Sequence, residues 1–158
     1  MHKKAAQQSK ASANAAKRQV GKRIRVLLAD DHTIVRQGLC SLLQFELDFE
    51  VVGEAENGRQ AIDLARQCSP EVVIMNVNMP VMNGIEATRI LTKEMPQVKV
   101  IALSMHSEKD TASGIREAEA IAYLTKGGPT EELMKAIRAA MQGRPKNSHQ
   151  TKSQIAHP

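Results

Sequence analysis

Aromatic side chains are scarce in this sequence. It has no Trp, one Tyr and two Phe, so a flavin or a row of nucleic-acid bases would find few rings to stack on. No apolar run approaches the roughly 18 residues of a membrane span, and the chain does not open on the apolar stretch of about 7 to 15 residues of a secretory signal. We therefore expect a soluble cytoplasmic protein with no membrane partner.

Cysteine is also scarce. Cys40 and Cys68 are the two cysteines, and they have neither CxxC spacing nor a neighbouring His. A metal or redox centre built on thiolates is therefore not indicated. Both residues lie within helical patterns, and we expect reduced, buried thiols.

Acidic residues are missing from both ends of the chain. Seven of the 22 Lys and Arg residues precede residue 24 and three follow residue 143, whereas all 17 Asp and Glu residues lie between. The net charge of +5 therefore comes from the ends, because residues 24–143 hold 12 basic and 17 acidic side chains. Both ends are polar and poor in large apolar residues, which is typical of disorder. We expect basic disordered tails at 1–23 and 144–158 around one folded domain at 24–143.

Within that domain, short β-branched runs alternate with apolar residues spaced three or four apart. The runs predict strands at 24–29, around 51–52, and at 72–75, 98–103 and 120–124. The spaced positions predict helices through Val35, Leu39 and Leu42, and through 61–68, 87–91 and 133–140; a further helix is placed at 107–118. Five such βα units predict a doubly wound α/β fold with a parallel sheet.

Polar residues follow four of the predicted strands. Asp30 and Asp31 follow the first strand, Asn76 the third, Ser104 the fourth and Lys126 the fifth. In an open parallel sheet the ligand site lies beyond the carboxyl ends of the strands. The sequence therefore predicts one locus with two carboxylates, an amide, a hydroxyl and an ammonium group. In isolation, the acid pair, Ser104 and Lys126 would each fit ordinary turn or surface positions.

The chain resembles a bacterial response-regulator receiver domain of the LuxR and nitrate-response type. The resemblance covers about residues 24 to 142 and rests on the segments RVLLADDHTIVRQGL, VVGEAENGRQAIDLA, PEVVIMNVNMPVMNGIEATRIL, VIALSMH and AYLTKGGPTEELMKAIR. It implies a flavodoxin-like sheet of strand order 2-1-3-4-5. It also implies a place in a two-component phosphorelay, with a histidine kinase or another signalling protein as partner.

The resemblance implies a magnesium site. In the family, Mg²⁺ binds the acids after the first strand, here Asp30 and Asp31, and a backbone carbonyl, here that of Asn78. His32 is given no catalytic role. Because an amide replaces one carboxylate of the family's site, we expect Mg²⁺ to bind weakly or not at all.

The resemblance also implies a phosphoryl acceptor, and here the chain departs from the family. Asn76 stands where the family has the acceptor Asp. Ser104 takes the position of the switch hydroxyl, Tyr123 that of the rotamer switch and Lys126 that of the phosphate-pairing lysine. We therefore expect a domain that is not phosphorylated at position 76, is not an enzyme and acts through protein contacts.

Two further departures affect the expected partner surface. Glu119 replaces the Gly that usually caps the helix before the fifth strand, and Ile121 replaces a small residue. A left-handed cap costs a non-Gly residue about 1 kcal/mol. In the family a homodimer forms through this fourth helix, the fifth strand and the fifth helix.

Other interpretations remain open at this point. The chain could be the receiver part of a DNA-binding transcriptional regulator with an engineered acceptor, since the 15 residues after Gly143 are too few for a helix-turn-helix domain. Its tails could bind nucleic acid without specificity, although specific DNA binding by this chain is not expected. A flavodoxin-like redox protein or a haloacid-dehalogenase-type phosphatase could share the architecture. The phosphatase requires Asp-x-Asp, however, and this chain has adjacent acids.

Overall fold

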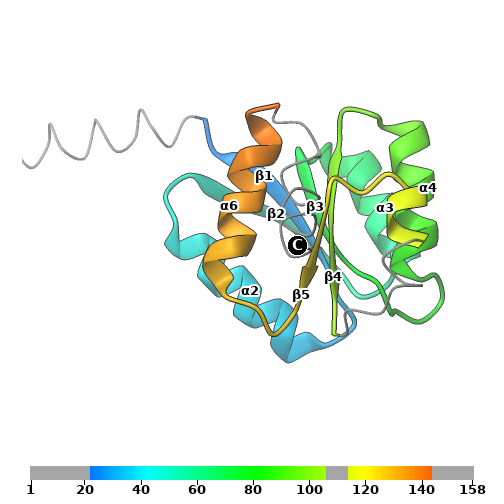
Figure 1. The fold of residues 1–158 in the computed structure, drawn as a ribbon, viewed down its shortest axis with the longest axis horizontal. Coiled ribbons are helices and arrows are strands. Elements are labelled where there is room, and N and C mark those ends of the chain that lie inside the picture. The colour runs from blue at the N-terminus through cyan, green and yellow to red at the C-terminus, as the bar shows by residue number, and fades with distance from the viewer. Residues whose placement is uncertain (1–21, 106–113, 144–158) are drawn as a thin grey trace, which may run out of the picture.

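The computed structural model describes residues 22–105 and 114–143 (Figure 1). Most of both expected tails and most of the helix expected at 107–118 lie outside the described residues. The strands are β1 (Ile24–Ala29), β2 (Phe49–Ala55), β3 (Val72–Asn76), β4 (Lys99–Ser104) and β5 (Ala122–Thr125). The helices are α2 (Thr33–Phe45), α3 (Gly58–Cys68), α4 (Gly84–Glu94) and α6 (Thr130–Met141), and residues 114–117 are also helical.

The strands form one parallel sheet in the order β2-β1-β3-β4-β5, as predicted. Alternate residues of each central strand face opposite sides of this sheet, so β1, β3 and β4 are apolar along almost their whole length. Helices α2 and α6 cover one face, while α3 and α4 cover the other (Figure 1). This is the doubly wound architecture.

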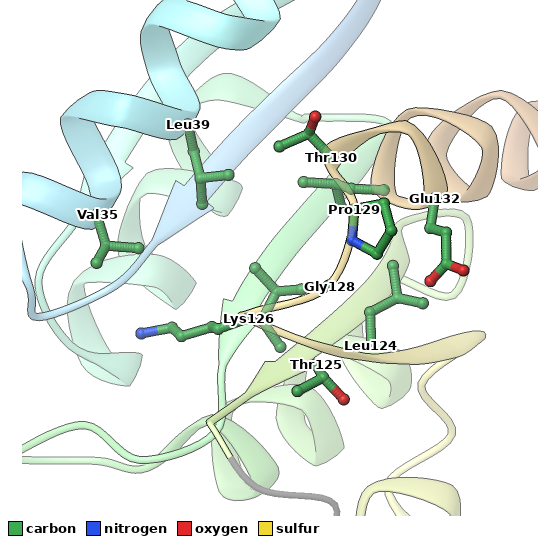
Figure 2. Close-up of a pocket in the computed structure, with 11 residues that line it drawn as sticks. Val35, Leu39, Leu124, Thr125, Lys126, Gly128, Pro129, Thr130 and Glu132 are labelled. Carbon is green, nitrogen blue, oxygen red and sulfur yellow. The ribbon is translucent and has the colours of Figure 1, made fainter.

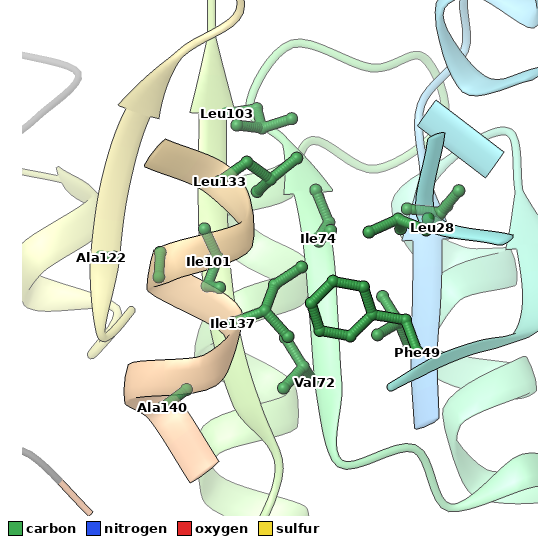
Figure 3. Close-up of a cluster of buried hydrophobic side chains, with 13 residues drawn as sticks. Leu28, Phe49, Val72, Ile74, Ile101, Leu103, Ala122, Leu133, Ile137 and Ala140 are labelled. Atoms are coloured by element: carbon green, nitrogen blue, oxygen red, sulfur yellow. The ribbon is translucent and has the colours of Figure 1, made fainter. Parts of the chain in front are cut away.

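The core between the sheet and α6 is built around branched aliphatic side chains. Phe49 and Ile137 meet over Val72 and Ile74 at the centre of the cluster (Figure 3). All four are at most 2% exposed. Filling the sheet face this closely fixes the strand register, and the register determines which residues stand at the carboxyl edge.

Several boundaries differ from the sequence-based expectation. The second strand was predicted as a short stretch, but β2 runs for seven residues. Strand β2 lies at the edge of the sheet, where its outer residues are exposed and polar, so no apolar run marks its full length. The fourth strand begins at Lys99 instead of residue 98, and the fifth at Ala122 instead of residue 120.

The predicted apolar stripe of α2 gave the helix correctly but not its buried face. Val35 and Leu42 remain 37% and 41% exposed. The buried face consists of Leu43 and Arg36, and Leu39 packs against the same core from its margin. The buried arginine interrupts the apolar pattern, which is why periodicity alone identified Leu39 but not Arg36 among the residues that face the core.

The thiols are free, as expected, but half-buried instead of fully buried. Burial raises the pKa of the Cys40 thiol, and the nearby Glu54 carboxylate adds to the effect. A raised pKa keeps the thiol protonated at neutral pH and therefore poorly nucleophilic. Cys68 lies in α3 and directs its sulfur toward the Val52 carbonyl oxygen at 3.6 Å.

Glu119 adopts the left-handed backbone that its position was expected to require, with φ of 69°. Its N–H donates to the Arg116 carbonyl, and the Ala120 N–H donates to the Ile115 carbonyl at 3.2 Å. These two bonds form a Schellman cap. The helix before β5 therefore ends as the family's glycine would end it, but with the steric cost of a Cβ atom.

Replacing Glu119 with Gly should raise the free energy of unfolding by about 1 kcal/mol, because Gly adopts this backbone without strain. The urea midpoint should increase while the m-value stays constant. Glu119→Ala is the matched control: it removes the same charge but keeps the Cβ atom, and it should leave the midpoint nearly unchanged. Equal midpoints for the Gly and Ala variants would contradict the strain assignment.

Arg138 ties α6 to the loop before β2. Its guanidinium donates to Asp48 through Nε at 2.7 Å and through Nη2 at 3.1 Å, and it lies 4.9 Å from the centre of the Phe49 ring. These hydrogen bonds from Arg138 lower the pKa of the Asp48 carboxyl. A lowered pKa stabilises the fold above the unfolded-state pKa of about 3.9, and that contribution is lost as the pH falls through the folded-state value.

A double-mutant cycle of Arg138→Met and Asp48→Asn should therefore show a coupling that depends on pH. Both side chains are about two-fifths exposed, so we expect a coupling of about 1 kcal/mol or less at pH 7. The coupling should shrink as the pH is lowered below about 4. Urea unfolding across the cycle measures it, and a coupling that is unchanged in acid would contradict a charge-assisted bond between Arg138 and Asp48.

Candidate functional site

The predicted locus exists at the carboxyl edge of the sheet. Parallel pairing aligns Ala29 with Met75 and Ser104 with Thr125. Residues at or just beyond these pairs therefore lie together at one end of the sheet. They are Asp30 after β1, Asn76 at the end of β3, Ser104 at the end of β4 and Lys126 after β5. Asp30, Asn76 and Ser104 are at most 3% exposed there, although their side chains are polar.

The Asn76 carboxamide is at the centre of the site. Its Nδ2 atom lies 3.3 Å from Asp30 Oδ1, 3.0 Å from Asp31 Oδ1 and 2.9 Å from the Asn78 carbonyl oxygen. Three acceptors thus surround one nitrogen that carries two hydrogens, so at least one N–H is shared. A carboxamide has its nitrogen on one side only, and this arrangement fixes which way it faces.

Lys126 provides the positive charge. Its Nζ lies 2.6 Å from Asp30 Oδ2, and the two side chains are only 5% and 3% exposed. Apart from this ion pair, neither atom has a hydrogen-bond partner among the described residues. The lysine comes from the loop between β5 and α6 and extends toward the end of the sheet where α2 begins (Figure 2). A buried carboxylate requires such a partner, because water cannot solvate it there.

Two residues that sequence reasoning did not assign to the site support Asp30: Arg36 of α2, and His32, the residue just before that helix. Arg36, largely buried, donates through Nη1 to the Asp30 carbonyl oxygen at 2.7 Å and through Nε to Glu54 at 3.2 Å. The His32 backbone N–H donates to Asp30 Oδ1 at 2.9 Å. One feature of the sequence could have pointed to Arg36, because it is the only charged residue in the segment that forms α2.

The His32 ring also lies at the acids. Its Nδ1 is 3.3 Å from Asp30 Oδ1 and 3.4 Å from Asp31 Oδ1, while 58% of the side chain stays exposed. The three side chains could supply ligand atoms to one cation. His32 was given no role from the sequence, and the structure places it at the rim of the site.

The predicted switch residues take different positions. Ser104 is buried at the end of β4, which pairs with β3, the strand that carries Asn76. Tyr123 is half-buried and packs against Val77, Ala102 and Ile115, beside the main site. Both therefore lie near the edge where the family's switch residues are expected, and their roles stay predictions.

Metal binding must compete with the Asn76 amide. Asp30, Asp31 and the Asn78 carbonyl present hard oxygen atoms, which are the ligands that Mg²⁺ prefers. However, the same three oxygens accept from one Asn76 nitrogen. The donor set suits the cation in kind, but the position between the oxygens already holds an N–H donor group. The residues present therefore do not fit Mg²⁺ unless the carboxamide gives way.

A doubly wound parallel sheet with paired acids, a hydroxyl and a lysine at its carboxyl edge defines a receiver domain. The response regulator receiver domain family matches residues 26–138, and the chain belongs to this family, as a receiver of a two-component system.

Relatives and solved structures agree with this assignment. LiaR, a transcriptional regulatory protein of Bacillus subtilis, is 43% identical over 123 residues, covering 78% of this chain and 58% of the relative. The response regulator GacA of Pseudomonas aeruginosa is 38% identical over 133 residues, covering 84% and 62%. This chain thus spans about three fifths of these relatives. The NarL receiver domain of Mycobacterium tuberculosis superposes with a TM-score of 0.74 at 28% identity, covering 78% of this chain and 99% of that one.

In the part of the chain that the structure describes, no helix is both long and apolar enough to cross a bilayer.

Replacing Lys126 with Met should lower the free energy of unfolding by about 3 kcal/mol, because Asp30 then keeps a buried charge without its cation. Lys135→Met, on an exposed position of α6, is the matched control and should change little. The double variant Asp30→Asn, Lys126→Met should recover part of the loss. Chemical unfolding measures all three, and equal effects at Lys126 and Lys135 would contradict a buried ion pair.

Proposed function

We propose that this receiver domain acts without phosphorylation at position 76, as a protein interaction module of its signalling system. The observation that carries the proposal is the carboxamide of Asn76, which stands at the acceptor position among Asp30, Asp31 and Lys126. The other positions of the site, Asp30, Asp31, Ser104 and Lys126, have the residue types of the family. Only position 76 differs, because it carries an amide in place of a carboxylate.

The chemistry follows from that exchange. Phosphorylation at this position in the family needs a carboxylate oxygen that attacks phosphorus and then holds the group as an acyl phosphate. A carboxylate oxygen does this, whereas an amide oxygen is a much weaker nucleophile. The buried amide also donates to the acids and thereby directs its nitrogen toward them. We infer that the domain performs no phosphoryl transfer and is not an enzyme, and that it binds Mg²⁺ weakly.

Response regulators interact with histidine kinases and form dimers, and we propose both kinds of partner here. The expected dimer surface includes β5, α6 and the helix predicted at 107–118. Residues 107–113 of that helix lie outside the described part of the chain. Helix α2 offers a second apolar surface, where Ile34 is 85% and Phe45 91% exposed. The one charged residue of α2, Arg36, is buried, so its exposed face carries no charge. An uncharged, partly apolar helix face supports a role in protein contact.

The link to transcription rests on the relatives. LiaR is named a transcriptional regulatory protein, and the chain matches about three fifths of it. We propose that residues 24–143 form the whole receiver unit, that the basic segments 1–23 and 144–158 act as tails or linkers, and that the domain regulates transcription through its partners. No observation favours nucleic-acid binding by the basic segments, which stays an alternative.

Incubation with acetyl phosphate and Mg²⁺ should leave the protein's intact mass unchanged, because Asn76 cannot accept the group. The matched variant Asn76→Asp should gain one phosphoryl group that alkali removes, since Asp30, Asp31, Ser104 and Lys126 are in place. Adding Asp31→Asn to that variant should suppress the gain. A stable phosphoryl group on the unaltered protein, at Ser104 or Thr125 for example, would refute the proposal.

A further inference from the structure

We propose that the Asn76 carboxamide is a built-in substitute for the cation: its N–H groups occupy the position between the oxygens of Asp30, Asp31 and Asn78 and close the site to divalent ions. This inference deepens the proposed function and rests on it. It goes further because Asn76 does more than remove a carboxylate from the site. Its N–H groups also compete with a cation for the same oxygen atoms.

The geometry supports a substitute because the amide bridges the groups that a cation would bridge. One nitrogen reaches a carboxylate from the β1 loop at 3.0 Å and a backbone carbonyl two residues further along its own loop at 2.9 Å. Asp30 Oδ1, at 3.3 Å, comes from the other acid. The loop after β3 is thus tied to the acids through hydrogen bonds alone.

The negative charges of the two acids are also partly compensated without an ion. Asp30 and Asp31 bring two negative charges, and the buried Lys126 ammonium cancels one of them at 2.6 Å. Asp31 is about 29% exposed, so water solvates its remaining charge in part, and Asn76 Nδ2 and His32 Nδ1 lie 3.0 Å and 3.4 Å from its Oδ1 atom. The amide dipole adds partial positive charge between the two acids. An acceptor Asp at position 76 would instead add a third negative charge at the same point.

The backbone around Asn76 leaves little room for another arrangement. A Cβ atom at Gly84 would lie 2.1 Å from the Asn76 carbonyl oxygen, so α4 packs directly against this residue. The Gly84 N–H donates to the Val77 carbonyl at 2.8 Å, which fixes the loop next to the amide. The backbone that carries the carboxamide is therefore held in place by α4, and the carboxamide itself by its contacts with the acids and the Asn78 carbonyl.

A competing account makes the opposite prediction. If the carboxamide rotated to present its oxygen, it would become a neutral ligand, and the site would be only a weakened version of the family's site. The Mg²⁺ affinities would then fall in the order Asp, Asn, Ala at position 76. If the amide blocks the site, Asn76→Ala removes the blocking group and frees the oxygens. The order becomes Asp, Ala, Asn.

The test is thermal melting of the full chain and its variants over a MgCl₂ titration from micromolar to tens of millimolar. We expect Asn76→Ala to bind Mg²⁺ about tenfold more tightly than the unaltered protein, because the ion no longer displaces hydrogen bonds to charged oxygens. Asn76→Asp should bind most tightly. Asn83→Ala serves as control: Asn83 caps α4 at the Glu86 N–H, so its loss destabilises the fold without touching the acids.

The outcome is read from the shift that Mg²⁺ produces in each variant, so a lower starting melting temperature does not obscure it. Should Asn76→Ala melt too broadly, Mn²⁺ binding measured by water-proton relaxation at low temperature gives the same ranking. Equal or weaker binding by Asn76→Ala than by the unaltered protein would overturn the inference. A Mg²⁺ shift in Asn83→Ala that matches Asn76→Ala would also overturn it, because destabilisation alone would then explain the gain.

This result is independent of the phosphorylation test. Phosphorylation of the unaltered protein would refute the proposed function. The Mg²⁺ affinities of the position-76 variants could still be ranked, so the present inference would still be tested. Conversely, the protein could resist acetyl phosphate while Asn76→Ala fails to gain affinity. The amide would then be a passive replacement, and only the present inference would fall.

Discussion

A carboxylate buried at the end of a strand constrains this molecule more than any other group. Asp30 is 2% exposed, and a charge in that position is tolerated only with compensating partners. The compensation comes from every side: Lys126 pairs with one oxygen, the His32 N–H and the Asn76 amide contact the other, and Arg36 holds the Asp30 backbone. These partners reach Asp30 only when β1, β3, β4 and β5 pair in the observed register. The charge and the fold are therefore coupled.

The strand ends could be predicted from the sequence because their physics is local. β-branched runs such as residues 72–75 can be buried on both faces only in a central parallel strand, and polar residues directly after such runs must reach the carboxyl edge. This reasoning, without any resemblance, placed Asp30, Asn76 and Ser104 together. The left-handed backbone at Glu119 was instead expected from the resemblance, because the family has a glycine cap at that position. The resemblance added the strand order and the role of each position.

The remaining features depend on contacts between distant residues. Arg36 breaks the apolar periodicity of α2, and its burial is favourable only because the Asp30 carbonyl and Glu54 lie above it. Nothing within residues 33 to 45 reveals those partners. Likewise, β2 extends to seven residues because β1 offers a parallel edge, not because its own sequence is strongly strand-forming. The direction of the Asn76 amide is set by three oxygens from two loops, and no sequence pattern encodes it.

The exchange of a carboxylate for an amide changes more than the nucleophile. With an Asp at position 76, three carboxylates would meet one lysine, and the loops that carry them would be drawn together fully only when a cation or a phosphoryl group altered the charge. With Asn76, the same loops are joined by hydrogen bonds to a neutral group. The site then has one negative charge fewer, so the arrangement of the loops depends less on a bound ion. Under the proposed function, this arrangement of the loops is the one that a partner recognises, and the partner would bind it without a phosphoryl group or an ion.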